Sequence, residues 1–185
     1  MARQNYLRDK EYFMLTAILA AQRSKDPKTQ VGACIVDNEN RIVGIGYNSS
    51  TKDFCDEDLP WDKPEKHLYV VHAEENAILN KNIANINGAK IYVTLFPCNK
   101  CAQLIKQSGI KEVIFCCDKD NEKDYNIASK KILEGIALTK YVLKTKKISF
   151  TFDDTEKISA EISKRSTDDI SQEGSQYCSL QLEDL

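Results

Sequence analysis

The sequence predicts an α/β protein with helices on both faces of a mixed central sheet, a three-layer α-β-α sandwich. Three observations lead to this prediction. Helix-forming segments alternate with β-rich segments along residues 10–152. The first two β-rich segments are separated by only a short turn, which favours antiparallel pairing. The segment 112–118 is apolar nearly throughout, as expected for a strand covered on both faces.

The first part of the chain predicts a helix, a hairpin and a loop. Residues 10–24 are good helix formers and apolar on nearly every side, so we expect a helix buried over most of its circumference. The segments 31–37 and 41–48 flank a turn-forming Asn-Glu-Asn sequence and predict a β-hairpin. Residues 49–71 have mixed polarity and two prolines, which predicts a long surface loop.

The second part of the chain alternates between helical and strand patterns. The predicted helices are 73–81, 99–109 and 124–134. The predicted strands are 90–96 and 112–118, with one or two more within 136–152. Gly88 marks a turn before the first of these strands, and Gly109 ends the middle helix.

We expect one folded domain at residues 1–153 and a polar, acidic tail at 154–185. From Asp154 onward there are three basic and eight acidic residues, a net charge of −5, so 1–153 carry +3 of the chain's total of −2. The tail is rich in Ser, Glu, Asp and Lys, which predicts a disordered or loosely helical segment. The mildly basic domain suits a small phosphorylated ligand and lacks the Lys/Arg-dense stripe that grips a long nucleic acid.

The composition indicates a protein of a reducing compartment. No apolar run is long enough to span a bilayer, and the first ten residues are polar and charged. We therefore expect neither a secretory signal nor a membrane partner, and a cytoplasmic or nuclear location. Seven cysteines without a secretion signal, two of them in a C-x-x-C motif, indicate metal ligation or catalysis before disulfides.

Two short stretches, HAEENAI at 72–78 and PCNKC at 97–101, contain a candidate metal site. Catalytic zinc takes three nitrogen or sulfur ligands and keeps one position for water. His72, Cys98 and Cys101 supply such a set. The two cysteines are spaced i, i+3 at the start of a predicted helix, directly after a proline, so both sulfurs can face one ion.

Glu74 is the candidate catalytic residue, because it lies close to His72 without being needed as a ligand. Zinc lowers the pKa of a bound water from about 15.7 to about 7, and a neighbouring carboxylate can move its proton. Both halves of the site precede helices, whose N-terminal dipoles favour ionised thiols. A lone C-x-x-C fits a redox pair or half a zinc ribbon equally well. The combination H-x-E…P-C-x-x-C is instead typical of zinc nucleobase deaminases.

Over residues 10–153 the sequence resembles the cytidine deaminase superfamily and, within it, the deoxycytidylate (dCMP) deaminases of the eukaryotic type. The stretches that show the resemblance are EYFM, AQRSKDPKTQVGACIV, GIGYN, LPW, VVHAEENAI, YVTLFPCNKCAQLI and GIKEVIF. The resemblance implies a cytidine deaminase-like fold. It also implies zinc-dependent hydrolysis of dCMP to dUMP and ammonia, which supplies dUMP for thymidylate synthesis.

The resemblance also implies roles for individual residues. Glu74 would take a proton from water and deliver it to N3 of cytosine and to the leaving amine. Asn48 matches the position that contacts the substrate sugar, and the backbone of Ala73 matches the one that holds the base. Arg23 and Lys25 are candidates for binding the phosphate; alternatively, they belong to a solvated helix end.

Two features bear on regulation and metal content. After Gly-Tyr-Asn the family usually has Gly-Met-Pro or Gly-Ser-Pro, whereas this chain has Ser49-Ser50-Thr51. In the family this region is associated with subunit contacts and with control by dCTP and dTTP. We therefore expect a homo-oligomer, a hexamer, in which activation by dCTP, with Mg²⁺ as a possible companion ion, is weakened or absent. Cys55 with His67 could hold a second, structural zinc, although only two ligands are visible.

Two other functions remain open from the sequence. The first is a deaminase acting on tRNA or single-stranded DNA, which needs a surface to hold the strand. The small positive charge of residues 1–153 gives such a surface little support. The second is a catalytically inactive homologue that keeps zinc for folding, which would have no reason to retain Glu74.

Overall fold

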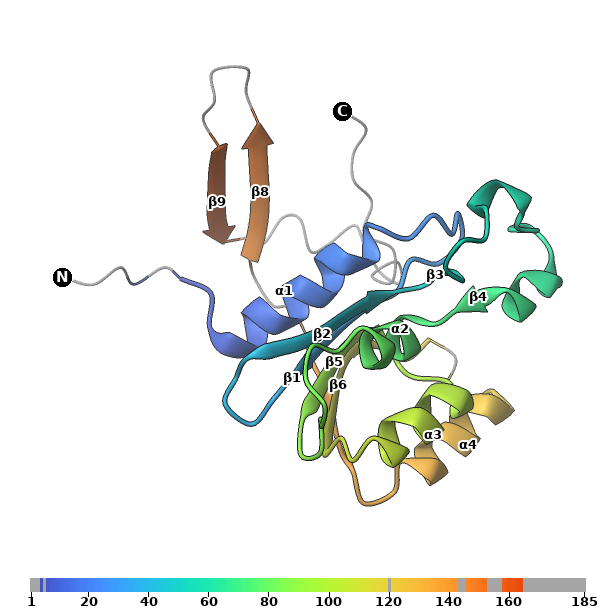
Figure 1. Cartoon of the computed structure of the whole chain (residues 1–185). Helices are drawn as coiled ribbons and strands as arrows, with labels where there is room; N and C mark the ends of the chain where they lie inside the picture. The colour runs from blue at the N-terminus through green and yellow to red at the C-terminus, as the bar shows by residue number, and fades with distance from the viewer. Residues whose placement is uncertain (1–3, 5, 120, 143–145, 153–157, 165–185) are drawn as a thin grey trace.

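The central sheet of the protein, a computed structural model, has five strands in the spatial order β2-β1-β5-β6-β7 (Figure 1). In chain order these strands are β1 (Gly32–Val36), β2 (Ile42–Tyr47), β5 (Lys90–Leu95), β6 (Glu112–Cys117) and β7 (Ala137–Lys140). β1 pairs antiparallel with β2 and β5, whereas β5, β6 and β7 run parallel. The predicted mixed sheet is confirmed. The structure describes residues 4, 6–119, 121–142, 146–152 and 158–164.

Helices cover both faces of this sheet, as predicted. On one face lies α1 (Asp9–Ala21), which packs on β1, β2 and β5. The other face carries α2 (Ala73–Leu79), α3 (Asn99–Gln107) and α4 (Asp124–Ile132), with α4 packed beside α3 (Figure 1). The three layers are therefore α1, the sheet, and the group of α2, α3 and α4.

Strand β1 shows how one sequence segment contributes to both halves of the core. All five of its residues are buried. Ala33 and Ile35 belong to the apolar cluster beneath α2 and α3, whereas Cys34 and Val36 belong to the cluster beneath α1. Side chains of a strand alternate between its faces, so a strand covered on both sides has apolar residues at every position.

The β1–β2 hairpin is present at the predicted place. Asn40 in its turn has a φ of 60°, a left-handed conformation that asparagine adopts more readily than most residues. Asp37 stabilises the turn: its Oδ1 accepts hydrogen bonds from the backbone N–H groups of Glu39 and Arg41, each at 2.9 Å. Its Oδ2 accepts a third from Arg41 Nε at 2.7 Å.

Helix α1 differs from its prediction. Tyr12 and Leu19 are 49% and 63% exposed, so the helix buries one side and not most of its circumference. The reason is its position in an outer layer: it packs on β1, β2 and β5 with one side. None of the described helices is long and apolar enough to cross a membrane.

Two further strands, β8 (Lys146–Phe152) and β9 (Ile158–Lys164), form a separate antiparallel pair. β9 lies within the segment 154–185, so the expectation of a disordered or loosely helical tail does not hold for this part. Its sequence ISAEISK alternates apolar and polar residues with the two-residue period of a strand. The remaining tail residues, 154–157 and 165–185, lie outside the described residues.

The predicted surface loop is closed at its base by a short ladder. β3 (Ser49–Ser50) pairs antiparallel with β4 (Val70–Val71). Between them, residues 51–69 form what we call the 51–69 loop, which contains two 3₁₀ turns, η1 (Asp56–Asp58) and η2 (Pro64–Leu68). The loop therefore leaves and re-enters the fold at neighbouring points.

Helix α2 packs unusually close to β2, and glycine makes this possible. A Cβ atom added at Gly46 would overlap the backbone oxygen of Ala73 and the backbone nitrogen of Ala77. A Cβ at Gly44 would meet the backbone oxygen of Ala77 at 2.5 Å. These two glycines set the height of α2, and of its N-terminus, above the sheet.

We expect Gly46→Ala to lower the free energy of unfolding by about 1–3 kcal/mol or more, because the methyl group overpacks the α2–β2 contact. Urea unfolding followed by circular dichroism would measure the loss. Ile45→Val, on the same strand and 43% exposed, is the control. An unfolding midpoint equal to that of the control would contradict the close α2–β2 contact.

Candidate active site

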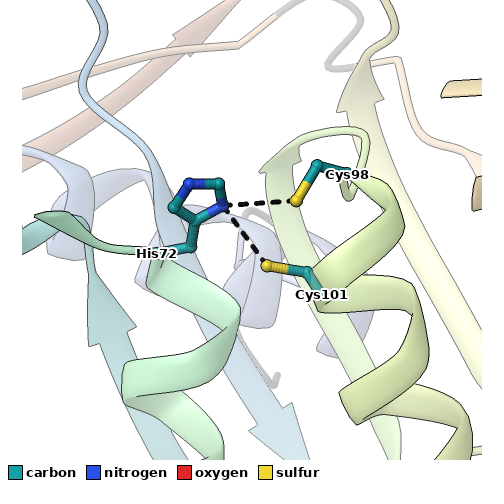
Figure 2. A group of neighbouring side chains, drawn as sticks. All are labelled: His72, Cys98 and Cys101. Atoms are coloured by element: carbon teal, nitrogen blue, oxygen red, sulfur yellow. Dashed lines mark hydrogen bonds between the residues drawn. The ribbon is translucent and has the colours of Figure 1, made fainter. Parts of the chain in front are cut away.

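The N-termini of α2 and α3 meet at one place on the sheet. β4 leads into α2, and β5 leads through the buried Pro97 into α3. His72 is the N-cap residue of α2 and Cys98 that of α3, and neither side chain caps its own helix. Cys101 follows in the first turn of α3. The three side chains therefore point toward one another across the gap between the two helices (Figure 2).

The geometry of this group suits a zinc ion. His72 Nδ1 lies 3.4 Å from the sulfurs of both Cys98 and Cys101, and all three donor atoms lie within 4.8 Å of one another. With Zn–N of about 2.0–2.1 Å and Zn–S of about 2.3 Å, a tetrahedral zinc separates its nitrogen and sulfur ligands by about 3.6 Å. The residue types and their spacing thus fit a catalytic zinc site with one position left open.

No second metal group of three or more His, Cys, Asp or Glu side chains occurs in the part of the chain that the structure describes. Cys55 and His67, the two residues considered for a structural zinc, are both exposed and belong to no such group. The structure does not support a second zinc at these residues.

The three donor side chains are linked to one another by hydrogen bonds. Hydrogen bonds from Cys101 and His72 lower the pKa of the Cys98 thiol to about 3. The hydrogen bond to Cys98 raises the pKa of His72 to about 9, and Cys98 also raises the pKa of Cys101 by holding its proton. Metal binding would require both thiols to lose their protons and the imidazole to be neutral, so a bound cation would replace these shared protons.

Glu74 is the buried acid of the site. It is the second residue of α2 and only 3% exposed. Burial raises the pKa of its carboxyl, while the charge on His72 lowers it in part. A carboxylate with a raised pKa is a stronger base, which is the property that proton transfer from water requires.

Asn48 directly precedes the β3–β4 ladder, and His72 directly follows it. In this ladder Ser49 pairs with Val71 and Ser50 with Val70. Asn48 is 6% exposed, and Ala73, the first residue of α2, is fully buried. Ala73 and Glu74 thus follow the donor His72 directly in the first turn of α2, and Asn48 lies next to the ladder that leads to His72.

Arg23 and Lys25 lie apart from the donor set. Both are exposed in the turn after α1, and they line a cavity of about 320 Å³ together with Tyr47, Lys52 and residues of the 49–54 segment. The Arg23 guanidinium lies 5.8 Å from the centre of the Tyr47 ring. None of the three metal donors lines this cavity.

Three polar residues that support the site were not predicted from the sequence. Asn76 Nδ2 donates to the Tyr47 carbonyl at 2.8 Å and to Ser49 Oγ at 3.1 Å, tying α2 to the start of the loop. Asp26 and Lys66 form a buried ion pair near Asn48. Asp26 and Asn76 lie within stretches already singled out, in SKDP and HAEENAI, but Lys66 lies in a loop without a recognisable signal.

Comparison with known proteins agrees with this geometry. The family model of the cytidine and deoxycytidylate deaminase zinc-binding region matches residues 7–117. The deoxycytidylate deaminases of Homo sapiens and Mus musculus are each 50% identical over 159 residues, covering 82% of this chain and 89% of theirs. A probable deoxycytidylate deaminase of Drosophila melanogaster is 46% identical over 164 residues, covering 82% and 81%.

Among solved structures, the dCMP deaminase of cyanophage S-TIM5 in complex with dCMP and dUMP is 28% identical, with a TM-score of 0.59. The match covers 74% of this chain and all of that one. The matched family region contains His72, Glu74 and both cysteines of the donor set. The chain therefore belongs to the cytidine and deoxycytidylate deaminase family.

Proposed function

We propose that this protein hydrolyses dCMP to dUMP and ammonia with the help of one zinc ion, and so supplies dUMP for thymidylate synthesis. The observation that carries the proposal is the buried carboxylate of Glu74 beside the donors His72, Cys98 and Cys101. A shared sequence identity of 50% with deoxycytidylate deaminases over most of the chain supports dCMP as the substrate.

The chemistry follows from the roles of a few groups. Zinc, held by the three donors, would lower the pKa of a water molecule so that its oxygen can attack C4 of cytosine. Glu74 accepts a proton from this water and donates it to N3. It then transfers the second proton to the amine, which leaves C4 as ammonia while the oxygen becomes the carbonyl of dUMP.

Three further groups would hold the nucleotide. Asn48, next to the β3–β4 ladder, would contact the sugar, and the backbone of Ala73 would hold the base at the start of α2. Arg23 and Lys25 are proposed to bind the phosphate. Their support is the shared cavity, where three cationic side chains, those of Arg23, Lys25 and Lys52, lie together with several hydroxyl groups.

The alternative functions have less support. A deaminase of tRNA or single-stranded DNA would need an extended basic surface, whereas residues 1–153 carry a net charge of only +3. An inactive scaffold would have no use for Glu74, since burying a carboxyl group costs stability unless it is compensated. A cytoplasmic location, with the nucleus as the alternative, stays a prediction from the sequence.

We expect the protein to deaminate dCMP and to leave deoxycytidine, dCTP and a cytosine-containing oligonucleotide largely unchanged. The measurement is ammonia release with each compound under the same conditions. Deamination of the oligonucleotide but not of dCMP would favour the nucleic-acid alternative. Absence of any turnover in protein with a full zinc content would favour the inactive scaffold.

We expect Glu74→Gln to reduce kcat by about 10²–10⁴-fold, because glutamine keeps the shape but accepts no proton. Zinc content, measured by elemental analysis, should stay near one ion per chain. Glu75→Gln is the matched control, with the same change in the same helical turn. Unchanged kcat in Glu74→Gln would mean that another group transfers the proton.

We further propose that the protein is a homo-oligomer, a hexamer. The 51–69 loop carries exposed apolar side chains at Phe54, Leu68 and Tyr69, with the rings of Phe54 and Tyr69 5.8 Å apart. Exposed apolar groups gathered on one loop are typical of a contact surface. Effector control in this region would involve a nucleoside triphosphate, with Mg²⁺ as its companion ion.

Activation by dCTP should be weak or absent, because the hydrogen-bonded hydroxyl group of Ser49 occupies space that a glycine at this position would leave open to an effector. Its Oγ donates to the Ser50 carbonyl at 2.9 Å and accepts from Asn76. Rates against dCMP concentration, with and without dCTP and Mg²⁺, are the measurement, and Ser49→Gly should increase the response. A sigmoidal curve that dCTP makes hyperbolic, with dTTP opposing it, would show that regulation is intact.

A further inference from the structure

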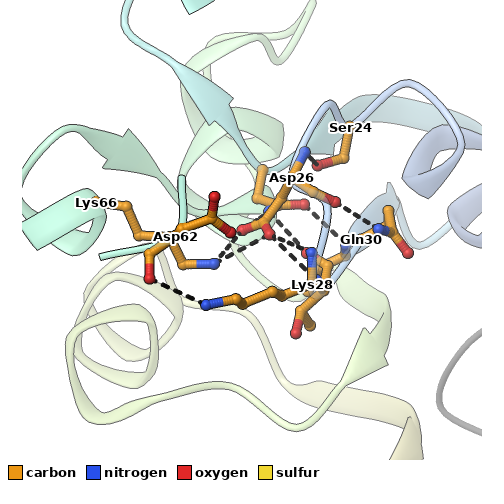
Figure 3. A network of polar contacts seen from close by, with 9 residues as sticks. Ser24, Asp26, Lys28, Gln30, Asp62 and Lys66 are labelled. Atoms are coloured by element: carbon orange, nitrogen blue, oxygen red, sulfur yellow. Dashed lines mark hydrogen bonds and ion pairs between the residues drawn. The ribbon is translucent and has the colours of Figure 1, made fainter. Parts of the chain in front are cut away.

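Asp26 is the centre of a buried polar network in the turn after α1 (Figure 3). Its carboxylate is nearly inaccessible to solvent. Asp26 Oδ1 accepts hydrogen bonds from the backbone N–H of Lys28 at 2.8 Å and of Thr29 at 3.2 Å. The side chain therefore fixes the shape of the turn 26–29.

Lys66 supplies the charge that balances Asp26. Its ammonium group lies 2.8 Å from Asp26 Oδ2 and 3.0 Å from Oδ1, and both side chains are buried. Lys66 belongs to η2, so the ion pair connects the turn after α1 with the 51–69 loop. A buried ion pair gains little stability over apolar side chains, because both charges lose their hydration. A positional role explains its presence better than stability does.

The network also determines the orientation of Asn48. Its Nδ2 donates to the Thr29 carbonyl at 3.0 Å and lies 3.5 Å from Asp26 Oδ2. Its Oδ1 accepts from the backbone N–H of Val31 at 2.8 Å. Both amide hydrogens are thus directed at the 26–29 turn, and the remaining capacity of the side chain is the second lone pair of Oδ1. Asn48 can offer a ligand an acceptor and not a donor.

We propose that Asp26 is a positioning residue for substrate recognition, with Lys66 as its counter-charge. By holding the 26–29 turn it fixes the amide of Asn48, so that Oδ1 accepts a hydrogen bond from the sugar hydroxyl of the nucleotide. The single free sugar hydroxyl of dCMP is at C3′, which makes this group the one recognised. The inference rests on the proposed function, because it assigns Asn48 to the sugar of dCMP.

The test compares dCMP with 2′,3′-dideoxycytidine 5′-monophosphate, which lacks the 3′-hydroxyl. Wild-type protein should prefer dCMP in kcat/KM by about tenfold or more, since the analogue leaves the second lone pair of the buried Asn48 Oδ1 without a partner. Asp26→Asn places an amide donor against the Lys66 ammonium and the Asn48 amide, so this preference should largely disappear. Asn48→Ala should remove it as well, and the combination of both changes should lower it no further.

Asp37→Asn is the matched control, because Asp37 also accepts two backbone N–H bonds and one from a cationic side chain, at the β1–β2 turn. It should keep the full preference for dCMP. If Asp26→Asn does not fold, Asp26→Asn with Lys66→Met removes both charges and leaves neither unpaired. In that variant the preference should also be lost while the zinc content stays near one per chain.

The possible outcomes separate the inference from the proposed function. Wild-type protein that does not turn over dCMP contradicts the function. Wild-type protein that is active, together with an Asp26 variant that keeps the preference for dCMP, contradicts the positioning role alone. A preference lost equally in Asp26→Asn and Asp37→Asn would show a general effect of destabilisation, which also contradicts it.

Discussion

The site depends on how closely α2 approaches β2. Because Gly44 and Gly46 have no side chains, the backbone of β2 contacts the backbone of α2 directly, and α2 lies close on the sheet. His72, Ala73 and Glu74 all belong to this end of the helix. Because the sheet below is close-packed, a change at the glycines moves the helix as a unit and not one side chain alone. The positions of His72 and Glu74 therefore depend on two glycines of β2 that lie outside the donor set.

Much of the fold follows from local patterns in the sequence. The nearly continuous apolar sequence of β6 predicts a strand covered on both faces, and its residues Val113 and Ile114 do lie in the two different apolar clusters. The exposure of Leu19 could not be predicted, because periodicity does not tell how many layers cover a helix. The strand Ile158–Lys164 was not predicted, because the polar composition of the tail was given more weight than the alternation of apolar and polar residues within this segment.

In the candidate site, the metal donors could be predicted from the spacing of their motif, whereas the residues that hold the surrounding segments in place could not. The donors His72, Cys98 and Cys101 come together as the motif suggests. Cys55 and His67 belong to no metal-binding group, because two residues on a loop do not supply the set of converging ligands that a metal site needs. The contact of Lys66 with Asp26 joins residues 40 positions apart, and no pattern in either segment indicates the other. Long-range polar pairing is decided by the packed fold alone.

The short β3–β4 ladder separates the 51–69 loop from the segment that begins at His72. It pairs Ser49 with Val71, so the chain returns beside its point of departure before it reaches His72. Closing a loop costs only about 0.6 kcal/mol more for each doubling of its length. Changes in length between Phe54 and η2 therefore cost little and do not require the pairing of Ser49 with Val71 to change. The outer part of the 51–69 loop can thus vary in length independently of the segment that ends at His72.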